Sequence, residues 1–308
     1  MKLNKLTKLN LITLSSTVIC SIILMQFTCA QNRITKKLSK SASNKIIFFD
    51  DFSGPVLDRS KWNIRITGET VNNEQQAYVD SAATIYIAKG NKAAGATHGA
   101  LVIQPRFSPG FTTKEGKKFD IISGRIDTRS KVEFTYGTVA ARIKMSEGTG
   151  FWPAWWILGT GRWPETGEID IMEFIGQKEW TNAAMHGPGY SGNTPFAKRD
   201  SFAVKDPVTN WHIYSVDWTP DSLMFKVDGN EFYKVTKSMV EKYGKWSYDN
   251  AKFLILNFAL GGGYPGGVNK VKEPYFGLPA SSVDLIKQGK SKIWIDWVSV
   301  TQIKHYTK

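Results

Sequence analysis

Cysteine is almost absent from this sequence of 308 residues, since Cys20 and Cys29 are the only two. Both lie within the first thirty residues, so the rest of the chain has no disulfide available. This excludes a small scaffold held together by disulfides. A domain of this length can be stable through burial of its core alone.

Long stretches of helical periodicity are also scarce, and the sequence contains no internal repeat and no nucleic-acid-binding motif. It is instead 42% hydrophobic, with 27 glycines, 11 tryptophans, 11 tyrosines and 17 phenylalanines. Short apolar segments separated by glycine predict a single all-β domain, folded as a sandwich. Most of the aromatic residues are expected in the core, but such abundance is also typical of carbohydrate-binding proteins, because sugar C–H faces lie on flat rings.

The formal net charge is +13, and residues 1–30 contribute three lysines and no acid, which leaves +10 for a chain that begins at Gln31. A basic surface can attract nucleic acid, anionic glycans or cell envelopes. The lysines are scattered along the chain rather than clustered. We therefore expect a solvated basic surface and no nucleic-acid partner.

Residues 1–30 have the pattern of a secretory signal, with a basic start, an apolar run over 11–27 and small residues at 28–30. We expect cleavage after Ala30 and a secreted, periplasmic or outer-surface protein. The alternative is a lipoprotein attached through Cys29, although Gln26 stands where a lipobox prefers leucine. The apolar run is short for a permanent membrane span, so no transmembrane anchor is expected after processing.

The polar residues 31–44 are interpreted as a flexible linker, and 45–308 as one domain without a clear second one. An Asp228-Gly229 dipeptide predicts a hairpin turn. A short helix is expected at 238–243 and a long polar loop at 268–290. The expected strands are 46–49, 84–88, 100–105, 122–127, 131–134, 137–145, 168–175, 182–186, 211–218, 223–227, 230–235, 252–260 and 293–300.

Three carboxylates, Glu168, Asp170 and Glu173, lie within six residues and are separated only by apolar residues. In a regular strand alternate side chains share a face, so Glu173 would point away from the other two acids into apolar surroundings, at high cost. One extra residue, a β-bulge near Ile171 or Met172, would return Glu173 to the face of the other acids.

Like charges in close proximity raise the pKa of at least one member of such a cluster. Two carboxyl groups with separated pKa values are what glycoside hydrolysis requires, one as nucleophile and one as proton donor. The alternatives at this point are a plain acidic edge strand and a site for a hard cation such as calcium. The spacing alone leaves all three open.

The motif Glu168-x-Asp170-x-x-Glu173 follows Trp163-Pro164 and a tryptophan-rich WPAWW run at 152–156. With HGPGYSG at 186–192, LNFALGG at 256–262 and IDWV at 295–298, it resembles glycoside hydrolase family 16. The resemblance covers about 46–302 and is strongest to the laminarinase-type members, which are endo-1,3-β-glucanases.

The resemblance implies a jelly-roll sandwich of two antiparallel sheets with a substrate cleft on its concave face. It also implies hydrolysis with retention of configuration. Glu168 would be the nucleophile, Glu173 the acid and then the base, and Asp170 would orient both. In a retaining enzyme the two carboxyl groups are about 5–5.5 Å apart.

The family match assigns substrate-binding roles to further positions. His186 is expected near the nucleophile, with a core histidine as the alternative, and Arg125 on the donor side, with a surface ion pair as the alternative. Trp152 and Trp156 are divided between cleft floor and core. The full expected set is Trp163, His186, Asn73, Glu74, Arg125, Trp152, Trp156 and Asn257.

Many family members bind a structural calcium ion away from the catalytic residues, and Asp51, Gly99 and Asp296 match its ligands here. An ordinary polar turn is the alternative. No cofactor is expected for catalysis.

Two positions depart from the family pattern. Tyr264 replaces the usual tryptophan, and the 268–290 loop is longer and more basic than usual. The predicted substrate is a β-1,3 or mixed β-1,3-1,4 glucan, cleaved internally by a monomer. Hydrolysis of an algal galactan such as agar, porphyran or carrageenan is one alternative, and a non-catalytic β-glucan-binding protein of the same fold is the other.

Overall fold

The computed structural model describes residues 45–303. The predicted signal 1–30 and linker 31–44 lie outside the described residues and stay predictions. Within the described part, no helix combines the length and the apolar character needed to cross a bilayer.

One sheet has eight strands, with the C-terminal strand β18 near its middle. All pairings in this sheet are antiparallel. β1 also pairs with β18, although it is not part of the linear order of the other seven strands. In spatial order the sheet contains β16 (Asn230–Thr236), β15 (Ser222–Val227), β14 (His212–Trp218), β9 (Gly137–Met145), β18 (Ile293–Thr301), β5 (Ala100–Ile103) and β4 (Ile85–Ala88), with β1 (Ile46–Asp50) against β18.

The second sheet has seven strands, is also antiparallel throughout, and contains the acidic strand next to its central strand. Its order is β13 (Ala197–Ser201), β12 (Trp180–His186), β11 (Glu168–Glu173), β10 (Phe151–Gly159), β17 (Lys252–Leu260), β8 (Arg125–Asp127) and β2 (Asn63–Ile64).

A small third sheet and five short helices complete the described fold. The sheet has the order β3 (Ala77–Tyr78), β7 (Lys118–Ser123) and β6 (Arg106–Thr112), with β3 and β7 parallel. The helices are η1 (Val71–Asn73), η2 (Gly90–Ala93), α2 (Lys237–Val240), α3 (Gly263–Asn269) and α4 (Ala280–Lys287).

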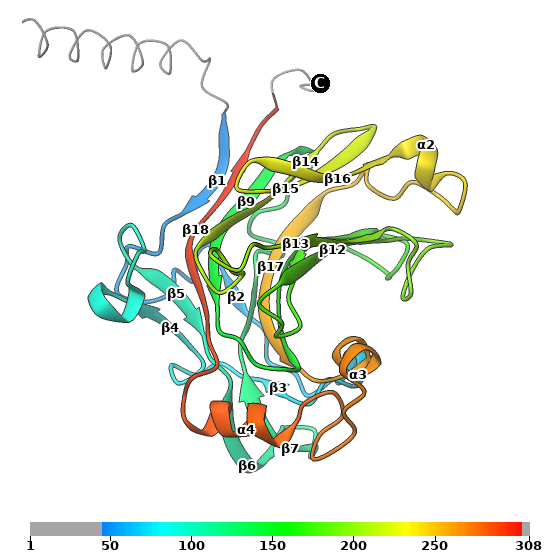
Figure 1. The fold of residues 1–308 in the computed structure, drawn as a ribbon. Coiled ribbons are helices and arrows are strands. Elements are labelled where there is room, and N and C mark those ends of the chain that lie inside the picture. The colour runs from blue at the N-terminus through cyan, green and yellow to red at the C-terminus, as the bar shows by residue number, and fades with distance from the viewer. Residues whose placement is uncertain (1–44, 304–308) are drawn as a thin grey trace, which may run out of the picture. The chain divides into compact units, whose positions relative to one another are not determined.

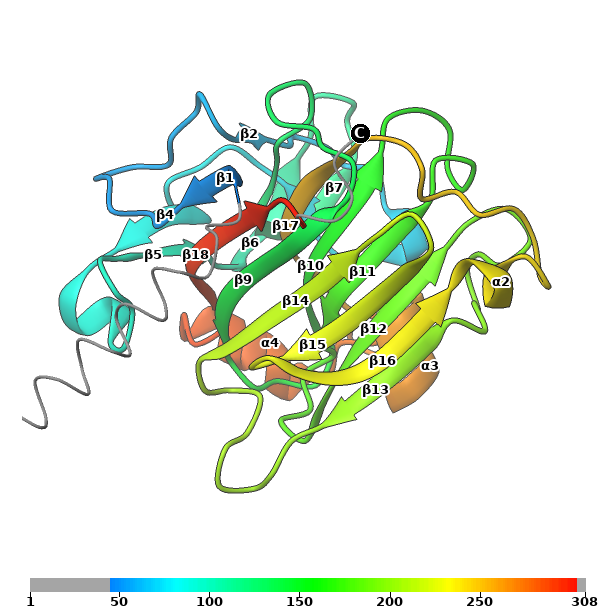
Figure 2. The ribbon, with the colours of Figure 1, turned by 90° about the horizontal axis from the view of Figure 1, so that it is seen from above.

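The two large sheets form the two layers of a sandwich, which confirms the predicted all-β fold. Figures 1 and 2 show β14, β15 and β16 lying over β11, β12 and β13. One large hydrophobic core joins the layers and includes Trp155, Met172, Val216 and Phe225. Alternation along β15 (burial of every second residue) turns one face of this strand toward that core.

The predicted Asp228-Gly229 hairpin is confirmed, since both residues have positive φ, 51° and 82°, and join the paired strands β15 and β16. The strand predicted over 122–127 is interrupted at Gly124, where the chain passes from the small sheet into the seven-stranded one. A side chain at Gly124 would lie 2.5 Å from Ile85 Cγ1, so the close approach requires glycine.

Two predictions of secondary structure are wrong, the strand over 131–134 and the loop over 268–290. Residues 131–134 contain only an isolated bridge at Phe134, and the polar loop predicted over 268–290 contains helix α4. Pro279 precedes that helix, and the helix buries Val283 and Ile286. Two apolar residues three positions apart are too weak a periodic pattern to predict a helix from the sequence.

Candidate active site

A β-bulge at Ile171 places the three acids on one face of β11. Along β10 the cross-strand partners are Ala154 with Glu173 and Trp156 with Asp170, so Ile171 is the extra residue between them. The register on the β12 side shifts at the same point. The bulge predicted from the sequence is therefore confirmed, and it returns Glu173 to the side of Glu168 and Asp170.

The tryptophans of β10 divide between the two faces of the sheet. Trp152 and Trp156 line the open face together with Ala154 and Leu158. Trp155 points the other way and is fully buried in the core. Because side chains alternate along a strand, Trp152 and Trp156 belong to the cleft floor and Trp155 to the core. The sequence had left the placement of Trp152 and Trp156 open.

Two adjoining cavities lie on the open face of the seven-stranded sheet, one on each side of the acids. The first, of about 340 Å³, includes Arg125 and Asn257 and is called the Arg125 side. The second, of about 700 Å³, includes His186 and Tyr264 and is called the Tyr264 side. Both are lined by Asn72, Trp152, Trp163, Glu168 and Glu173, so together they form one cleft with the acids at its centre.

Burial raises the pKa of all three carboxyl groups. For Glu168, burial and the negative charge of Asp170 raise the pKa from 4.5 to about 8. For Asp170, burial and the charge of Glu173 raise the pKa well above its usual value. The cluster therefore retains at least one proton at neutral pH, which an acid–base reaction needs.

Glu173 is fixed by two N–H donors. Trp152 Nε1 donates to Oε1 at 3.0 Å, and Asn182 Nδ2 donates to Oε2 at 3.2 Å. These bonds oppose the larger effect of burial, which leaves the pKa of Glu173 raised. Asn182 was not identified from the sequence, although it lies four residues before His186 on β12 and so shares its face.

His186 reaches the cluster through Asp170, with 3.2 Å between Nε2 and Oδ2. Ligand atoms of Glu168, Asp170 and His186 lie within 4.8 Å of one another, which a metal ion could use. Two carboxylates and one imidazole supply fewer oxygens than the six to eight that calcium takes. The donor set therefore does not fit a hard cation, the alternative that the spacing had left open.

Asn257 braces the floor of the Arg125 side. Its Oδ1 accepts from Trp156 Nε1 at 2.7 Å, and its Nδ2 donates to the Tyr78 hydroxyl at 3.0 Å. Tyr78 in turn bonds Glu74, whose pKa is raised by burial. Tyr78 is a site residue that the sequence did not reveal, because its partner Asn257 is 179 residues away.

Of the four remaining residues that were expected in the site, three line the cleft and one does not. Trp163 is 46% exposed and lines both halves of the cleft, while Glu74 and Arg125 line the Arg125 side. Asn73 lines neither cavity, and its neighbour Asn72 does instead. Both residues have φ of 57°, so the chain makes a left-handed turn at this rim of the cleft.

Helix α3 (Figure 1) lines the Tyr264 side with Gly263, Tyr264 and Gly267, and it contacts η1. Tyr264 packs edge-on against Trp152, with 5.7 Å between ring centroids. No lysine of the basic 268–290 segment lines either cavity. Lys287 lies instead over the Phe107 ring outside the cleft, because α4 packs on β6.

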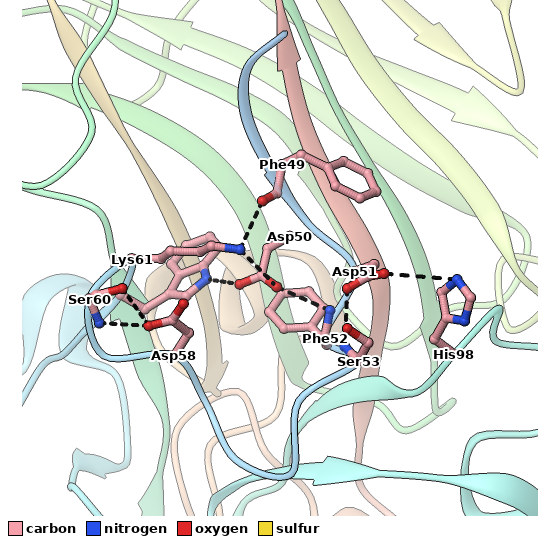
Figure 3. A network of polar contacts seen from close by, with 10 residues as sticks. Phe49, Asp50, Asp51, Phe52, Ser53, Asp58, Ser60, Lys61 and His98 are labelled. Atoms are coloured by element: carbon pink, nitrogen blue, oxygen red, sulfur yellow. Dashed lines mark hydrogen bonds and ion pairs between the residues drawn. The ribbon is translucent and has the colours of Figure 1, made fainter.

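The side chains of the expected calcium site already have protein partners. Asp296 is fully buried and accepts from Thr97 through both oxygens and from Arg142 Nη1 at 2.6 Å. Asp51 accepts from the Ser53 N–H and faces His98 (Figure 3). A side chain at Gly99 would lie 2.9 Å from the Phe52 carbonyl, so packing accounts for this glycine. The carboxylates of Asp51 and Asp296 are therefore engaged by protein donors, and a calcium site that also uses backbone carbonyls stays a prediction.

The comparisons agree with this geometry. A family model described as "Glycosyl hydrolases family 16" matches residues 62–271. The glucan endo-1,3-beta-glucosidase A1 of Niallia circulans is 32% identical over 73% of this chain, which spans 35% of that relative. The beta-glucanase of Rhodothermus marinus is 28% identical over 86% of this chain, which spans 89% of it.

A solved structure gives the same result. The laminarinase catalytic domain of Thermotoga maritima superposes with a TM-score of 0.70 at 28% identity, covering 85% of this chain and 99% of that one. The two-sheet fold, the acidic motif on its bulged strand and the family model coincide. The chain therefore belongs to glycosyl hydrolase family 16.

Proposed function

We propose that this protein hydrolyses internal β-1,3 or mixed β-1,3-1,4 glucosidic bonds of laminarin-like glucans with retention of configuration. The observation that carries the proposal is the bulge at Ile171, which collects Glu168, Asp170 and Glu173 at the centre of an open cleft. Cavities on both sides of the acids leave room for sugar units on either side of the bond, as internal cleavage requires.

In the first step Glu168 attacks the anomeric carbon while the bond to the leaving oxygen breaks. Glu173 gives its proton to that oxygen, and the sugar in the cleft excludes water from Glu173 and keeps its pKa raised. Asp170, whose pKa burial raises well above its usual value, accepts the proton that Glu168 gives up when it attacks.

In the second step Glu173, now ionised, removes a proton from water, and the water oxygen replaces Glu168 on the anomeric carbon. Trp152 and Asn182 position Glu173 for both roles through their N–H bonds. Trp163 offers an exposed ring beside the acids, on which a sugar can stack. Residues 1–30 would direct the chain out of the cytoplasm before it acts.

The proposal is tested by reducing-sugar release from laminarin, barley mixed-linkage glucan, agarose, porphyran and carrageenan. We expect short oligosaccharides from laminarin, and a loss of at least about a thousandfold in kcat for Glu168→Gln. Undiminished hydrolysis by the Glu168→Gln variant would show that Glu168 is not the nucleophile. Release confined to a galactan would overturn the substrate, and binding without release would favour a glucan-binding protein.

A further inference from the structure

Three arginines line the Arg125 side of the cleft: Arg65, Arg125 and Arg129. Only Arg125 was expected there. Arg125 begins β8 and Arg129 follows that strand, whereas Arg65 follows the neighbouring strand β2. We call these residues the arginine trio.

Arg65 and Arg125 are direct cross-strand neighbours. The ladder between β2 and β8 pairs Asn63 with Asp127 and Ile64 with Ile126, and the Arg65 N–H continues it by donating to the Arg125 carbonyl at 2.9 Å. Like charges directly opposite each other destabilise an antiparallel pair. Burial lowers the pKa of Arg125 most, the charges of Glu74 and Asp127 raise it, and the positive charge of Arg65 lowers it by a smaller amount. Arg65 therefore remains an unfavourable neighbour of Arg125, although Glu74 and Asp127 offset part of the repulsion.

The trio has no ionic partner within the described residues. Glu69, Glu74 and Asp127 also line this half of the cleft. No ion pair within 4.0 Å joins any of these acids to an arginine of the trio. Glu74 instead accepts from Gln76 and Tyr78, and Asp127 accepts from Asn63 and the Arg129 N–H.

The guanidinium groups are held by stacking, which leaves their N–H edges free. Arg125 lies over the Trp156 ring at 4.8 Å, and Arg129 over the Phe253 ring at 4.5 Å. The Nε atoms of both are buried and have no acceptor within residues 45–303. Cation–π contacts fix the planes of the guanidinium groups but do not satisfy the in-plane donors.

We propose that the arginine trio binds an anionic substituent, a sulfate ester or a carboxylate, carried by the glycan on the Arg125 side of the scissile bond. A guanidinium fork matches both groups with two parallel hydrogen bonds. An anion also relieves the repulsion between Arg65 and Arg125, which a neutral sugar hydroxyl does not. The inference rests on the proposed function, because the position of the substituent is defined relative to the glycosidic bond that is hydrolysed.

The test is calorimetric binding to the full chain carrying Glu168→Gln, which leaves the ligand uncleaved. The ligands are one neutral β-1,3-gluco-oligosaccharide, its sulfated form and its carboxymethylated form. We expect at least one anionic form to bind about tenfold more tightly than the neutral one. The preference is expected to weaken with added salt. The sulfated and carboxymethylated arms separate the two kinds of substituent.

Arg65→Gln and Arg129→Gln, each added to Glu168→Gln, are expected to reduce this preference to about twofold. The matched control is Arg106→Gln, which removes the same charge on β6 outside both cavities. It is expected to keep the preference, and thermal unfolding checks that each variant is folded.

Equal affinity for neutral and anionic forms would overturn the inference, and so would a preference that survives Arg65→Gln and Arg129→Gln. Absence of binding to every form would overturn it as well. The proposed hydrolysis is judged separately, by sugar release from neutral glucans with the unaltered protein, so the two failures are distinguishable.

Discussion

Lys252, at the start of β17, is fully buried. Its ammonium donates to the carbonyls of Thr166, Gly167 and Ser247 and to Asn250 Oδ1. Burial lowers its pKa to about 7, against the attraction of Glu168. One side chain thus fixes the two residues that lead directly into the acidic strand.

Replacing Lys252 by methionine is expected to lower the free energy of unfolding by about 3 kcal/mol, because buried carbonyls lose their donor. Lys252→Arg should recover part of the loss. Urea unfolding measures both. Because the segment before Glu168 is loosened, kcat should fall more than KM rises. Unchanged stability in Lys252→Met would show that these four contacts contribute nothing.

The raised pKa of Glu168 also gives stability a pH dependence. The folded chain keeps this proton up to about pH 8, while the unfolded chain loses it near pH 4.5. The folded state therefore binds more protons in this window, and stability falls as the pH rises through it. Asp170 and Glu173, whose pKa values are also raised, act in the same direction.

Glu168→Gln removes one of these titrating groups. The loss of unfolding free energy between about pH 5 and about pH 8 is expected to shrink by about 2 kcal/mol in the variant. Urea unfolding at several pH values provides the measurement, with Glu115→Gln on an exposed turn as the control. Parallel curves for the variant and the unaltered protein would contradict the assignment.

Site residues could be predicted from the sequence where the pattern that identifies them spans only a few neighbouring residues. The acids and their bulge follow from alternation over six residues and from the cost of burying Glu173 alone. Lys252 and Tyr78 were not predictable, since their partners lie 86 and 179 residues away in the sequence. The arginine trio is missed for the same reason, because two strands distant in sequence bring it together.

At the scale of elements, the bulge in β11 is the feature on which the site depends. Deleting Ile171 would leave a regular strand in which Glu168, Asp170 and Glu173 still share a face, with all existing cross-strand partners kept. The deletion removes a buried side chain and the local twist that a bulge adds. The acids would therefore stay together at an altered separation.

We expect the Ile171 deletion variant to fold with a loss of about 2–4 kcal/mol of stability. Its kcat should fall at least about a hundredfold, because small misplacements of reacting groups are costly. Circular dichroism and sugar release from laminarin measure the two effects. Ile171→Ala is the matched control, which keeps the bulge and should lose stability but little activity. Full activity in the deletion variant would show that the bulge has no catalytic role.

Strands were predictable to within a few residues wherever apolar runs were bounded by turns, as for β9 and β17. Short or polar elements were not. Helix α3 spans the sequence GYPGGVN, in which three glycines and a proline disfavour a helix. Its position depends on packing against η1, a tertiary contact that overrides local propensity.

At the scale of the whole molecule, Arg142 links three separate segments of the chain. From β9 it donates to the Gly95 carbonyl and to Asp296 on β18, and Asp296 also binds Thr97. An internal guanidinium thus neutralises the carboxylate that was expected to bind calcium. The stability of the domain is therefore predicted not to depend on a metal ion.

Excess chelator is expected to shift the thermal unfolding midpoint by less than about 1 °C. Arg142→Met should lower the free energy of unfolding by about 3–5 kcal/mol, because it leaves Asp296 charged and buried. Lys144→Met, on the same strand, is the control. A large downward shift with chelator, reversed by added calcium, would show that a cation binds there through other groups.

The place of β18 has a consequence for the order of events in synthesis. This strand ends at Thr301, yet it pairs with β9, β5 and β1, so a segment made after all of them joins the beginning of the domain to its middle. The eight-stranded sheet cannot form while the ribosome still retains that segment. This sheet is therefore completed late, after its other strands have been made.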